Sequence, residues 1–141
     1  MENHMTVTFD AISENEAFAR MVVSAFLVGA NPMVSELDDV KTAVSEAVTN
    51  AIIHGYEEKV GYVLMHCILK EKQLTVCVQD FGHGIADIAQ AREPFYTTKP
   101  ELERSGMGFA FMETFMDRVE VTSEIGVGTT VTMTKQLQDQ T

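Results

Sequence analysis

The sequence predicts a two-layer α+β sandwich, in which a mostly antiparallel sheet carries three helices on one face. Apolar residues recur at helical spacing in three segments, and five further segments show the runs or alternation typical of strands. Four of the five strands come as two hairpins, and strands joined by short turns are antiparallel. Because three helices cannot cover both faces of five strands, we expect them all on one face.

Composition limits the class of protein. The chain has 141 residues, is 45% hydrophobic and carries a net charge of −11, which fits one domain over residues 1–141 with a real core. We find no span long enough for a membrane and no secretory signal, so we expect a cytoplasmic protein without a membrane partner. The acidic balance argues against direct nucleic-acid binding. It favours a basic partner surface, or a ligand whose charge is met by a metal and backbone dipoles.

The first third of the chain predicts a strand and two helices. Met5, Val7 and Phe9 alternate as in a short strand, and Ser13 opens a capping-box pattern before the first helix. That helix carries one apolar stripe, which we assign to the core: Ala17, Phe18, Met21, Val22 and Ala25. Ser35 is the expected cap of a second helix that ends at Gly55. Its apolar stripe comprises Leu37, Val40, Val44, Ala47, Val48, Ala51 and Ile52.

The rest of the chain predicts two hairpins around a third helix. Residues 62–69 and 74–79 form the first hairpin, and its first strand is apolar on both faces, which places it inside the sheet. Periodicity then fails from Phe81 to Gly108, a length typical of a functional connection. The third helix covers 109–116, and the closing hairpin comprises 118–122 and 129–134. Cys67 and Cys77 are expected to be reduced, buried thiols.

Glu46 and Asn50 stand one turn apart in the second predicted helix, on the side opposite its main apolar stripe. A carboxylate next to a carboxamide can hold a water or hydroxyl and an oxygen-seeking cation. The alternative interpretation is a solvated polar face. Two observations favour a site: Ala43 and Ile53 on the same face are apolar, and asparagine is a poor residue for a helix interior.

Two glycine motifs and a threonine follow along the chain. Asp80 ends a strand just before Gly82 and Gly84. At this place a carboxylate could accept a hydrogen bond from an exocyclic amine, and the glycines would let the backbone approach a flat ring closely. The glycine-rich turn before Phe109 opens a helix whose amides could bind an anion. Thr130 enters the last strand. Each motif alone is also typical of an ordinary turn, whereas their order and spacing together are specific.

In this order the motifs resemble those of the ATPase and kinase superfamily shared by DNA gyrase, the Hsp90 chaperone, histidine kinases and MutL. Residues 46–50 resemble its N box, 80–84 its first glycine box and 106–108 its second, and Thr130 matches its threonine near the adenine. The resemblance covers nearly the whole chain. It implies a Bergerat-type ATP-binding fold in which residues 85–105 form a long ATP lid.

The resemblance also implies roles for single residues. Asn50 would ligate Mg²⁺ beside bound ATP or ADP, Glu46 would accept the proton of the nucleophile or orient it, and Asp80 would bind the adenine amino group. The other implied nucleotide contacts are His54, Gly55, Gly82, Gly84, Thr97, Thr98, Lys99, Arg104, Ser105, Gly106, Met107, Gly108, Phe109 and Thr130. For Lys99 and Arg104 a solvated lid charge is an equal alternative.

Residues 45–58 and 97–109 are similar to the sporulation anti-sigma factors of endospore-forming bacteria. That resemblance implies a homodimeric serine kinase which inhibits a sigma factor of the sigma F type and phosphorylates an anti-anti-sigma protein. The alternatives are a stress-response anti-sigma kinase with other partners, and a binding module that uses ATP only as a switch. Glu46 favours a kinase, because a switch needs no base. We expect neither the helix pair of histidine kinases nor the transducer domain of gyrase and chaperones.

A second stripe on the first helix is a candidate partner surface. Arg20, Val23 and Leu27 follow Glu16 at helical spacing, and Arg20 is the first basic residue in a strongly acidic stretch. A lone arginine flanked by exposed Val and Leu is typical of a contact anchor. The alternative is a helix buried on two sides, with Arg20 paired locally to Glu16. Because the resemblance implies partner surfaces outside the ATP site, we expect these three residues to bind a partner protein.

Overall fold

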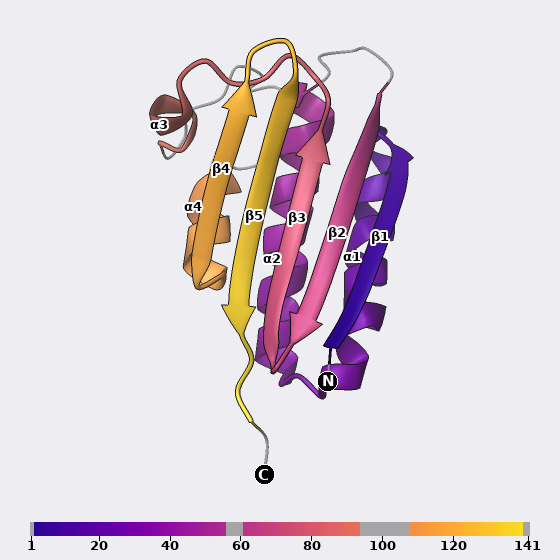
Figure 1. The fold of residues 1–141 in the computed structure, drawn as a ribbon. Helices are drawn as coiled ribbons and strands as arrows, with labels where there is room; N and C mark the ends of the chain where they lie inside the picture. The colour runs from indigo at the N-terminus through magenta and orange to yellow at the C-terminus, as the bar shows by residue number, and fades with distance from the viewer. Residues whose placement is uncertain (1, 56–60, 94–107, 140–141) are drawn as a thin grey trace.

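The computed structural model describes residues 2–55, 61–93 and 108–139, and it confirms the predicted α+β sandwich. Its antiparallel strands are β1 (Glu2–Asp10), β2 (Tyr62–Lys70), β3 (Gln73–Asp80), β4 (Arg118–Glu124) and β5 (Gly128–Gln136). Its helices are α1 (Glu14–Leu27), α2 (Val34–Asn50), α3 (Ile88–Ala91) and α4 (Gly108–Phe115), with a 3-10 turn η1 (Val28–Ala30) and a π-helix η2 (Ala51–Gly55). Figure 1 shows α1, α2 and α4 all behind the sheet.

The sheet has the strand order β1-β2-β3-β5-β4, so the last strand of the chain lies inside the sheet and β4 lies at its edge. β2 lies between β1 and β3, as its apolar sequence predicts. Pairing of β3 with β5 places Asp80 opposite Thr129. The fold therefore brings the first glycine box next to the start of the last strand.

The core lies between the sheet and the helices. Alternate residues of β2 and β3 are fully or almost fully buried against the helix layer, while the intervening residues face the uncovered side of the sheet. α2 is the central helix and packs against both α1 and α4. Its buried residues are Glu36, Val40, Ala43, Val44, Ala47 and Val48. The predicted stripe of α2 is thus confirmed at Val40, Val44, Ala47 and Val48.

The start of α2 differs from the prediction. The N-cap is Met33, and the Glu36 carboxylate accepts the Met33 backbone N–H at 2.9 Å. Ser35 therefore lies inside the first turn. The predicted Ser35 cap is wrong because a glutamate three residues after the cap satisfies the orphan N–H whichever residue occupies the cap position.

The buried face of α1 also differs from the prediction. Ala19, Val23 and Leu27 are fully buried, whereas Phe18 is 46% and Met21 is 69% exposed. The assignment of the Phe18 and Met21 stripe to the core is therefore wrong, and so is the assignment of Val23 and Leu27 to a partner surface. Both stripes have helical spacing and similar hydrophobicity, so periodicity could not decide which one faces α2.

The two cysteines are free and face opposite sides of the sheet. Cys67 is buried among the core residues, where burial raises the pKa of its thiol to about 12. Cys77 is half-buried on the side without helices, so the expectation of two buried thiols holds fully only for Cys67. None of the helices in the described ranges is long and apolar enough to cross a membrane.

Candidate functional site

The last turn of α2 and the first residue of α4 meet at one point. A Cβ atom on Gly108 would lie 3.1 Å from Asn50 Nδ2, 3.3 Å from Asn50 Oδ1 and 3.3 Å from Glu46 Oε2. Glu46 and Asn50 are half-buried, one turn apart on the same helix. The structure therefore brings together three of the predicted site residues, and a side chain at position 108 would crowd both polar groups.

The helix continues after Asn50 as the π-helix η2, not as the α-helix that the sequence predicts to Gly55. η2 packs against β3 and β5, and thereby connects the Asn50 end of α2 to the sheet. A π-turn contains more residues per turn than an α-turn, so Ile53 no longer continues the face of Asn50. The backbones of His54 and Gly55 form the end of this segment. Single π-turns are frequent at functional sites.

Asp80 forms the second part of the site, at the end of β3. Its side chain is buried, with 5% exposure, and Oδ1 accepts the Gly82 backbone N–H at 3.0 Å. Burial raises the pKa of the Asp80 carboxyl, and hydrogen bonds from the backbone N–H groups of Gly82 and Thr129 oppose that rise. A buried carboxylate with spare acceptor capacity can bind a donor from a ligand.

The first glycine box is attached to the β4–β5 turn by backbone contacts. Gly84 has a φ of +84°, and a Cβ atom there would lie 2.5 Å from the Glu124 carbonyl oxygen. The Gly126 backbone N–H donates to the His83 carbonyl at 2.9 Å. Glycine is thus required at 84 both by its left-handed conformation and by this close approach.

The threonine that lies beside Asp80 is Thr129, not Thr130. Asp80 pairs with Thr129 across β3 and β5, and both side chains are buried on the helix side of the sheet. Thr130 pairs with Gln79 and faces the uncovered side. The role of Thr130 near the base stays a prediction, and the structure places its neighbour Thr129 beside Asp80 instead. The alternation of β5 could have identified Thr129, because Val131 and Met133 share its face.

Ser123 of β4 joins these parts, and the sequence analysis did not single it out. Its hydroxyl oxygen accepts the Ile85 backbone N–H at 2.7 Å and lies 2.8 Å from Thr129 Oγ1. It also lies 3.1 Å from the Gly128 carbonyl oxygen, to which it can donate. A serine in an edge strand carries no motif, so only the strand pairing reveals this position.

Arg92 is a second residue that the sequence analysis missed. It follows α3 and donates from Nε to Glu113 Oε1 of α4 at 2.9 Å. Its guanidinium carbon lies 6.0 Å from the centre of the Phe109 ring. α3 itself, capped by Asp87 and visible beside β4 in Figure 1, falls in a stretch without predicted structure. Arg92 thereby connects the residues after the first glycine box to the start of α4.

Some of the remaining predicted nucleotide contacts are residues that the structure describes, and others are not. Gly82, Gly84, Gly108 and Phe109 lie at the two ends of the site described above. Most of the predicted lid, residues 94–105, lies outside the described residues. So do the following predicted contacts: Thr97, Thr98, Lys99, Arg104, Ser105, Gly106 and Met107.

Arg20 lies on α1, away from these residues. Its Nε lies 2.9 Å from Glu16 Oε1, and Arg20 is 42% exposed while Glu16 is 15% exposed. Glu16 in turn accepts a hydrogen bond from Ser45 of α2. The local Glu16 pair that we weighed as the alternative is therefore present, and Arg20 still reaches the surface.

Comparison with protein families gives a match over most of the chain. Residues 9–135 match the family described as the histidine kinase-like ATPase domain. A solved structure of the RsbU and RsbW domains of a Mycobacterium tuberculosis protein superposes with a TM-score of 0.73, covering 98% of this chain and 33% of that one. The two sequences are 22% identical, so this likeness concerns the fold alone.

Curated relatives are much more similar in sequence. The anti-sigma F factor of Oceanobacillus iheyensis is 53% identical over 138 residues, which cover 97% of this chain and 94% of the relative. The anti-sigma F factor of Clostridium acetobutylicum is 54% identical over 136 residues, covering 96% of this chain and 95% of the relative.

Proposed function

The chain belongs to the histidine kinase-like ATPase family and, within it, to the anti-sigma F factors, and from this membership we propose that it is a protein serine kinase. In this proposal it binds and inhibits a sigma factor of the sigma F type. It also transfers the γ-phosphoryl group of ATP to a serine of an anti-anti-sigma protein. The observation that carries the proposal is the meeting of Glu46, Asn50 and Gly108.

Asn50 fits the role of a Mg²⁺ ligand. Its Oδ1 and Glu46 Oε2 would each lie 3.3 Å from a Cβ atom on Gly108, so two oxygen donors face the same small space in front of that glycine. Mg²⁺ prefers such oxygen ligands and keeps most of its waters, so one carboxamide suffices. When bound, the ion would supply positive charge against the phosphates. That charge explains how a chain of net charge −11 could bind a polyanion.

Glu46 fits the role of proton acceptor. The transfer forms a bond between the serine oxygen and the γ-phosphorus and breaks the bond from that phosphorus to the ADP oxygen. The serine proton then passes to the Glu46 carboxylate. Positioning and electrostatic stabilisation carry most of such catalysis, so holding the carboxylate one turn from Asn50 is the main contribution of α2.

Asp80 fits the recognition of the base. Its buried carboxylate already accepts from Gly82 and has further lone pairs for the exocyclic amine of adenine. We retain Gly82, Gly84, Gly108, Phe109, His54 and Gly55 as proposed nucleotide contacts. Residues 1–141 would then form one kinase domain in which 85–105 close over ATP.

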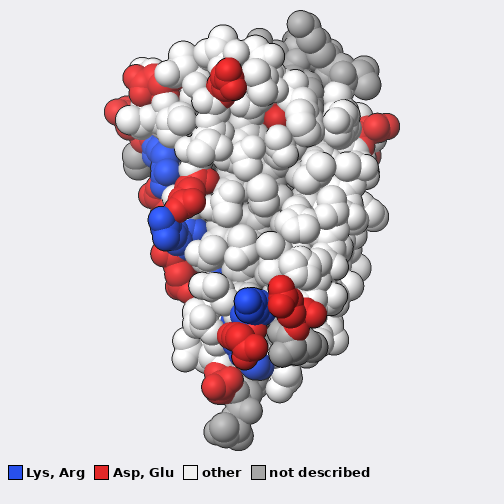
Figure 2. Space-filling view, viewed as in Figure 1, with Lys and Arg blue, Asp and Glu red and all other residues white. Residues whose placement is uncertain are grey.

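The uncovered face of the sheet supports the proposed homodimer. Its central residues are uncharged, and the half-buried ones include Leu64, His66, Ile68 and Cys77. Figure 2 shows the middle of this face free of Lys, Arg, Asp and Glu. Two chains that each carry a charge of −11 repel one another, so an uncharged face offers the least electrostatic opposition to self-association.

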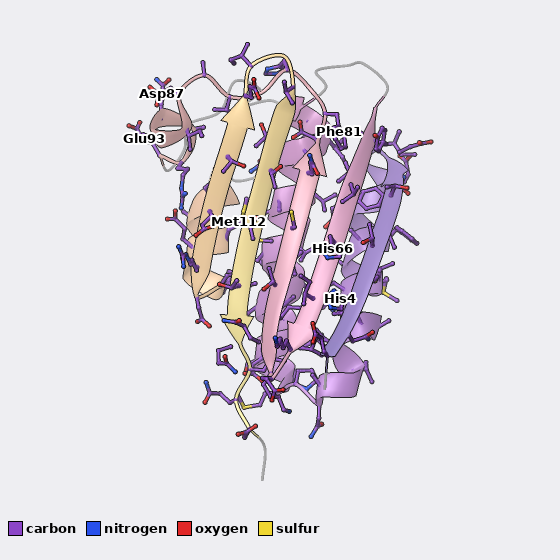
Figure 3. All side chains as sticks on the ribbon, viewed as in Figure 1. His4, His66, Phe81, Asp87, Glu93 and Met112 are labelled. Atoms are coloured by element: carbon purple, nitrogen blue, oxygen red, sulfur yellow. The ribbon has the colours of Figure 1, made fainter. Side chains whose placement is uncertain are left out.

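Aromatic groups add to this face. The rings of His4 and His66 lie 6.1 Å apart on β1 and β2, and Tyr62 lies 5.0 Å from Phe81 at the end of β3 (Figure 3). Tyr62 is 47% exposed in the single chain. Aromatic residues are enriched in protein interfaces. We place the dimer in the cytoplasm, where a sigma factor would be available.

The deciding experiment is phosphotransfer from radiolabelled ATP to anti-anti-sigma proteins of the same genome. Glu46→Gln should retain Mg-ATP binding and lose transfer, because the amide cannot take the serine proton. Asn50→Ala should lose Mg-dependent ATP binding. Asp38→Asn, an exposed change earlier in α2, is the matched control and should behave as the parent protein.

Two results would overturn parts of this proposal. Normal Mg-ATP affinity of Asn50→Ala in titration calorimetry would exclude Asn50 as the protein ligand. ATP-dependent capture of the sigma factor without any phosphotransfer by the parent protein would instead support the switch alternative.

A further inference from the structure

The hydroxyl of Ser123 has three partners, one after the first glycine box and two at the start of β5. Ile85 N lies at 2.7 Å, Thr129 Oγ1 at 2.8 Å and the Gly128 carbonyl oxygen at 3.1 Å. Ser123 is half-buried and shares the helix side of the sheet with Thr129. The role proposed above for Asp80 does not require this serine.

The hydroxyl protons of Ser123 and Thr129 can be assigned by counting the donors and acceptors at each group. A hydroxyl donates one hydrogen bond and accepts two. Ile85 N can only donate and the Gly128 carbonyl can only accept, so Ser123 accepts from Ile85 and gives its single proton to Gly128. The contact with Thr129 is then a hydrogen bond only if Thr129 donates. All three contacts are satisfied together in this arrangement and in no other.

Thr129 is consequently left as an acceptor towards its other neighbours. Its hydroxyl proton points to Ser123, so the hydroxyl has no second proton to donate, and its side chain is buried on the face of the sheet where Asp80 lies opposite it. Its own backbone N–H is directed to the Asp80 carboxylate. The two side chains therefore present only lone pairs to a ligand.

We propose that Ser123 is a specificity-determining positioning residue, which holds the Thr129 hydroxyl as an acceptor and so selects adenine over bases with a carbonyl at the same ring position. This inference rests on the proposed function, because it assumes that a purine nucleotide binds at Asp80. An exocyclic amine has two protons, one for Asp80 and one for Thr129. Hypoxanthine can donate its ring N–H to Asp80, but its carbonyl oxygen would meet the Thr129 lone pairs.

The test compares Mg-ADP with Mg-IDP by titration calorimetry, so no phosphotransfer is needed. In Ser123→Ala the Thr129 proton is released and can be donated to a carbonyl. We expect the preference for ADP over IDP to fall about tenfold, the worth of one hydrogen bond gained or lost. Ser123→Thr keeps a hydroxyl and should retain most of the preference. Ser24→Ala, whose hydroxyl donates to the Arg20 carbonyl on α1, is the matched control and should retain all of it.

A second variant covers the case in which Ser123→Ala does not fold. Thr129→Val keeps the branched shape and removes the hydroxyl, so it should weaken ADP binding and leave IDP binding almost unchanged. Equal weakening of both nucleotides in Ser123→Ala, or an unchanged preference in Thr129→Val, would overturn the inference and leave Ser123 a structural residue. Failure of the parent protein to bind either nucleotide would overturn the proposed function itself.

Discussion

The Glu36 carboxylate accepts the backbone N–H of Gln138 at 2.8 Å through Oε2, although the two residues are 102 positions apart in the sequence. The other oxygen of Glu36 accepts the Met33 N–H at the start of α2. The side chain is 5% exposed. One buried carboxylate therefore fixes both the beginning of the central helix and the segment after the last strand.

Removal of this carboxylate should destabilise the protein strongly. Glu36→Ala leaves two backbone donors without partners, and each hydrogen bond to a charged group contributes about 1.5–3 kcal/mol. We expect a loss of about 3 kcal/mol in the free energy of unfolding, measured by urea denaturation. Glu36→Gln retains one acceptor oxygen and should lose about half as much. A loss of only a few tenths of a kcal/mol in the free energy of unfolding of Glu36→Ala would show that water replaces both hydrogen bonds.

The pKa of Asp80 predicts a specific dependence on pH. Burial raises the pKa of this carboxyl above its ordinary value of 3.8, so the unfolded chain loses the proton first as pH rises. The contribution of Asp80 to the free energy of unfolding is therefore complete below about pH 4 and declines as pH rises through the folded-state pKa. The measurement is the difference in the free energy of unfolding between the parent protein and Asp80→Asn, obtained by urea denaturation across this pH range. Taking the difference cancels the contributions of the other carboxylates.

Nucleotide binding should respond in the opposite direction. The carboxylate is the acceptor for the adenine amine in the proposed function, so ADP affinity should fall as pH is lowered through the same range. Asp80→Asn should bind weakly at every pH and show no such change. A stability difference between the two proteins that is constant with pH would contradict the assigned shift.

Gly128 and Gly126 form a matched pair for testing the contact between β3 and β5. Gly128 has a φ of +141°, and a Cβ atom there would lie 2.1 Å from the Asp80 carbonyl oxygen. Gly126 has a φ of +82° with open space around it. Gly126→Ala should cost about 1–2 kcal/mol of backbone strain alone. Gly128→Ala must also displace β5 from Asp80, so we expect more than about 4 kcal/mol.

Urea denaturation and ADP titration of both variants check this prediction. Gly128→Ala should lose nucleotide affinity together with stability, because Asp80 and Thr129 move apart. Gly126→Ala should keep its affinity. Equal costs for the two changes would show that the chain relieves the close approach elsewhere.

The sequence was sufficient for elements whose signal is local. Glu46 and Asn50 are one turn apart on any helix, so their proximity followed from spacing alone, and the first hairpin followed from two apolar runs joined by a short polar segment. Where two patterns were equally regular, the sequence did not determine which one is buried. The two stripes of α1 are equally regular, and only packing against α2 buries the one with Val23.

Other features depend on contacts between segments distant in the chain. Two adjacent threonines point to opposite faces of β5, and only the strand pairing places Thr129, and not Thr130, opposite Asp80. Ser123 acquires its partners only when β4, β5 and the first glycine box assemble. The π-helix after Asn50 packs against β3 and β5, and these contacts between distant segments are not visible in the local sequence.

The exposed face of α1 leads to a last prediction, about partner binding. Phe18 and Met21 are exposed beside Arg20, which forms a surface pair with Glu16. Under the proposed function, Arg20→Glu should weaken capture of the sigma factor or of the anti-anti-sigma protein, because it inverts the positive charge of this patch. Met21→Asp should act likewise through the apolar contact. The melting temperature of Met21→Asp should change little, since exposed substitutions cost only a few tenths of a kcal/mol. Arg20→Glu also places a like charge one turn from Glu16, which adds a cost of about 0.2–0.5 kcal/mol.

Val23→Asp is the opposite control, because it places an unpaired charge in the core and should prevent folding. Pull-down and phosphotransfer assays on folded Arg20→Glu and Met21→Asp then separate two possibilities. Reduced binding of one partner with unchanged ATP affinity would place that partner on α1. Behaviour identical to the parent protein in both assays would mean that α1 is scaffold and that the partners bind another face.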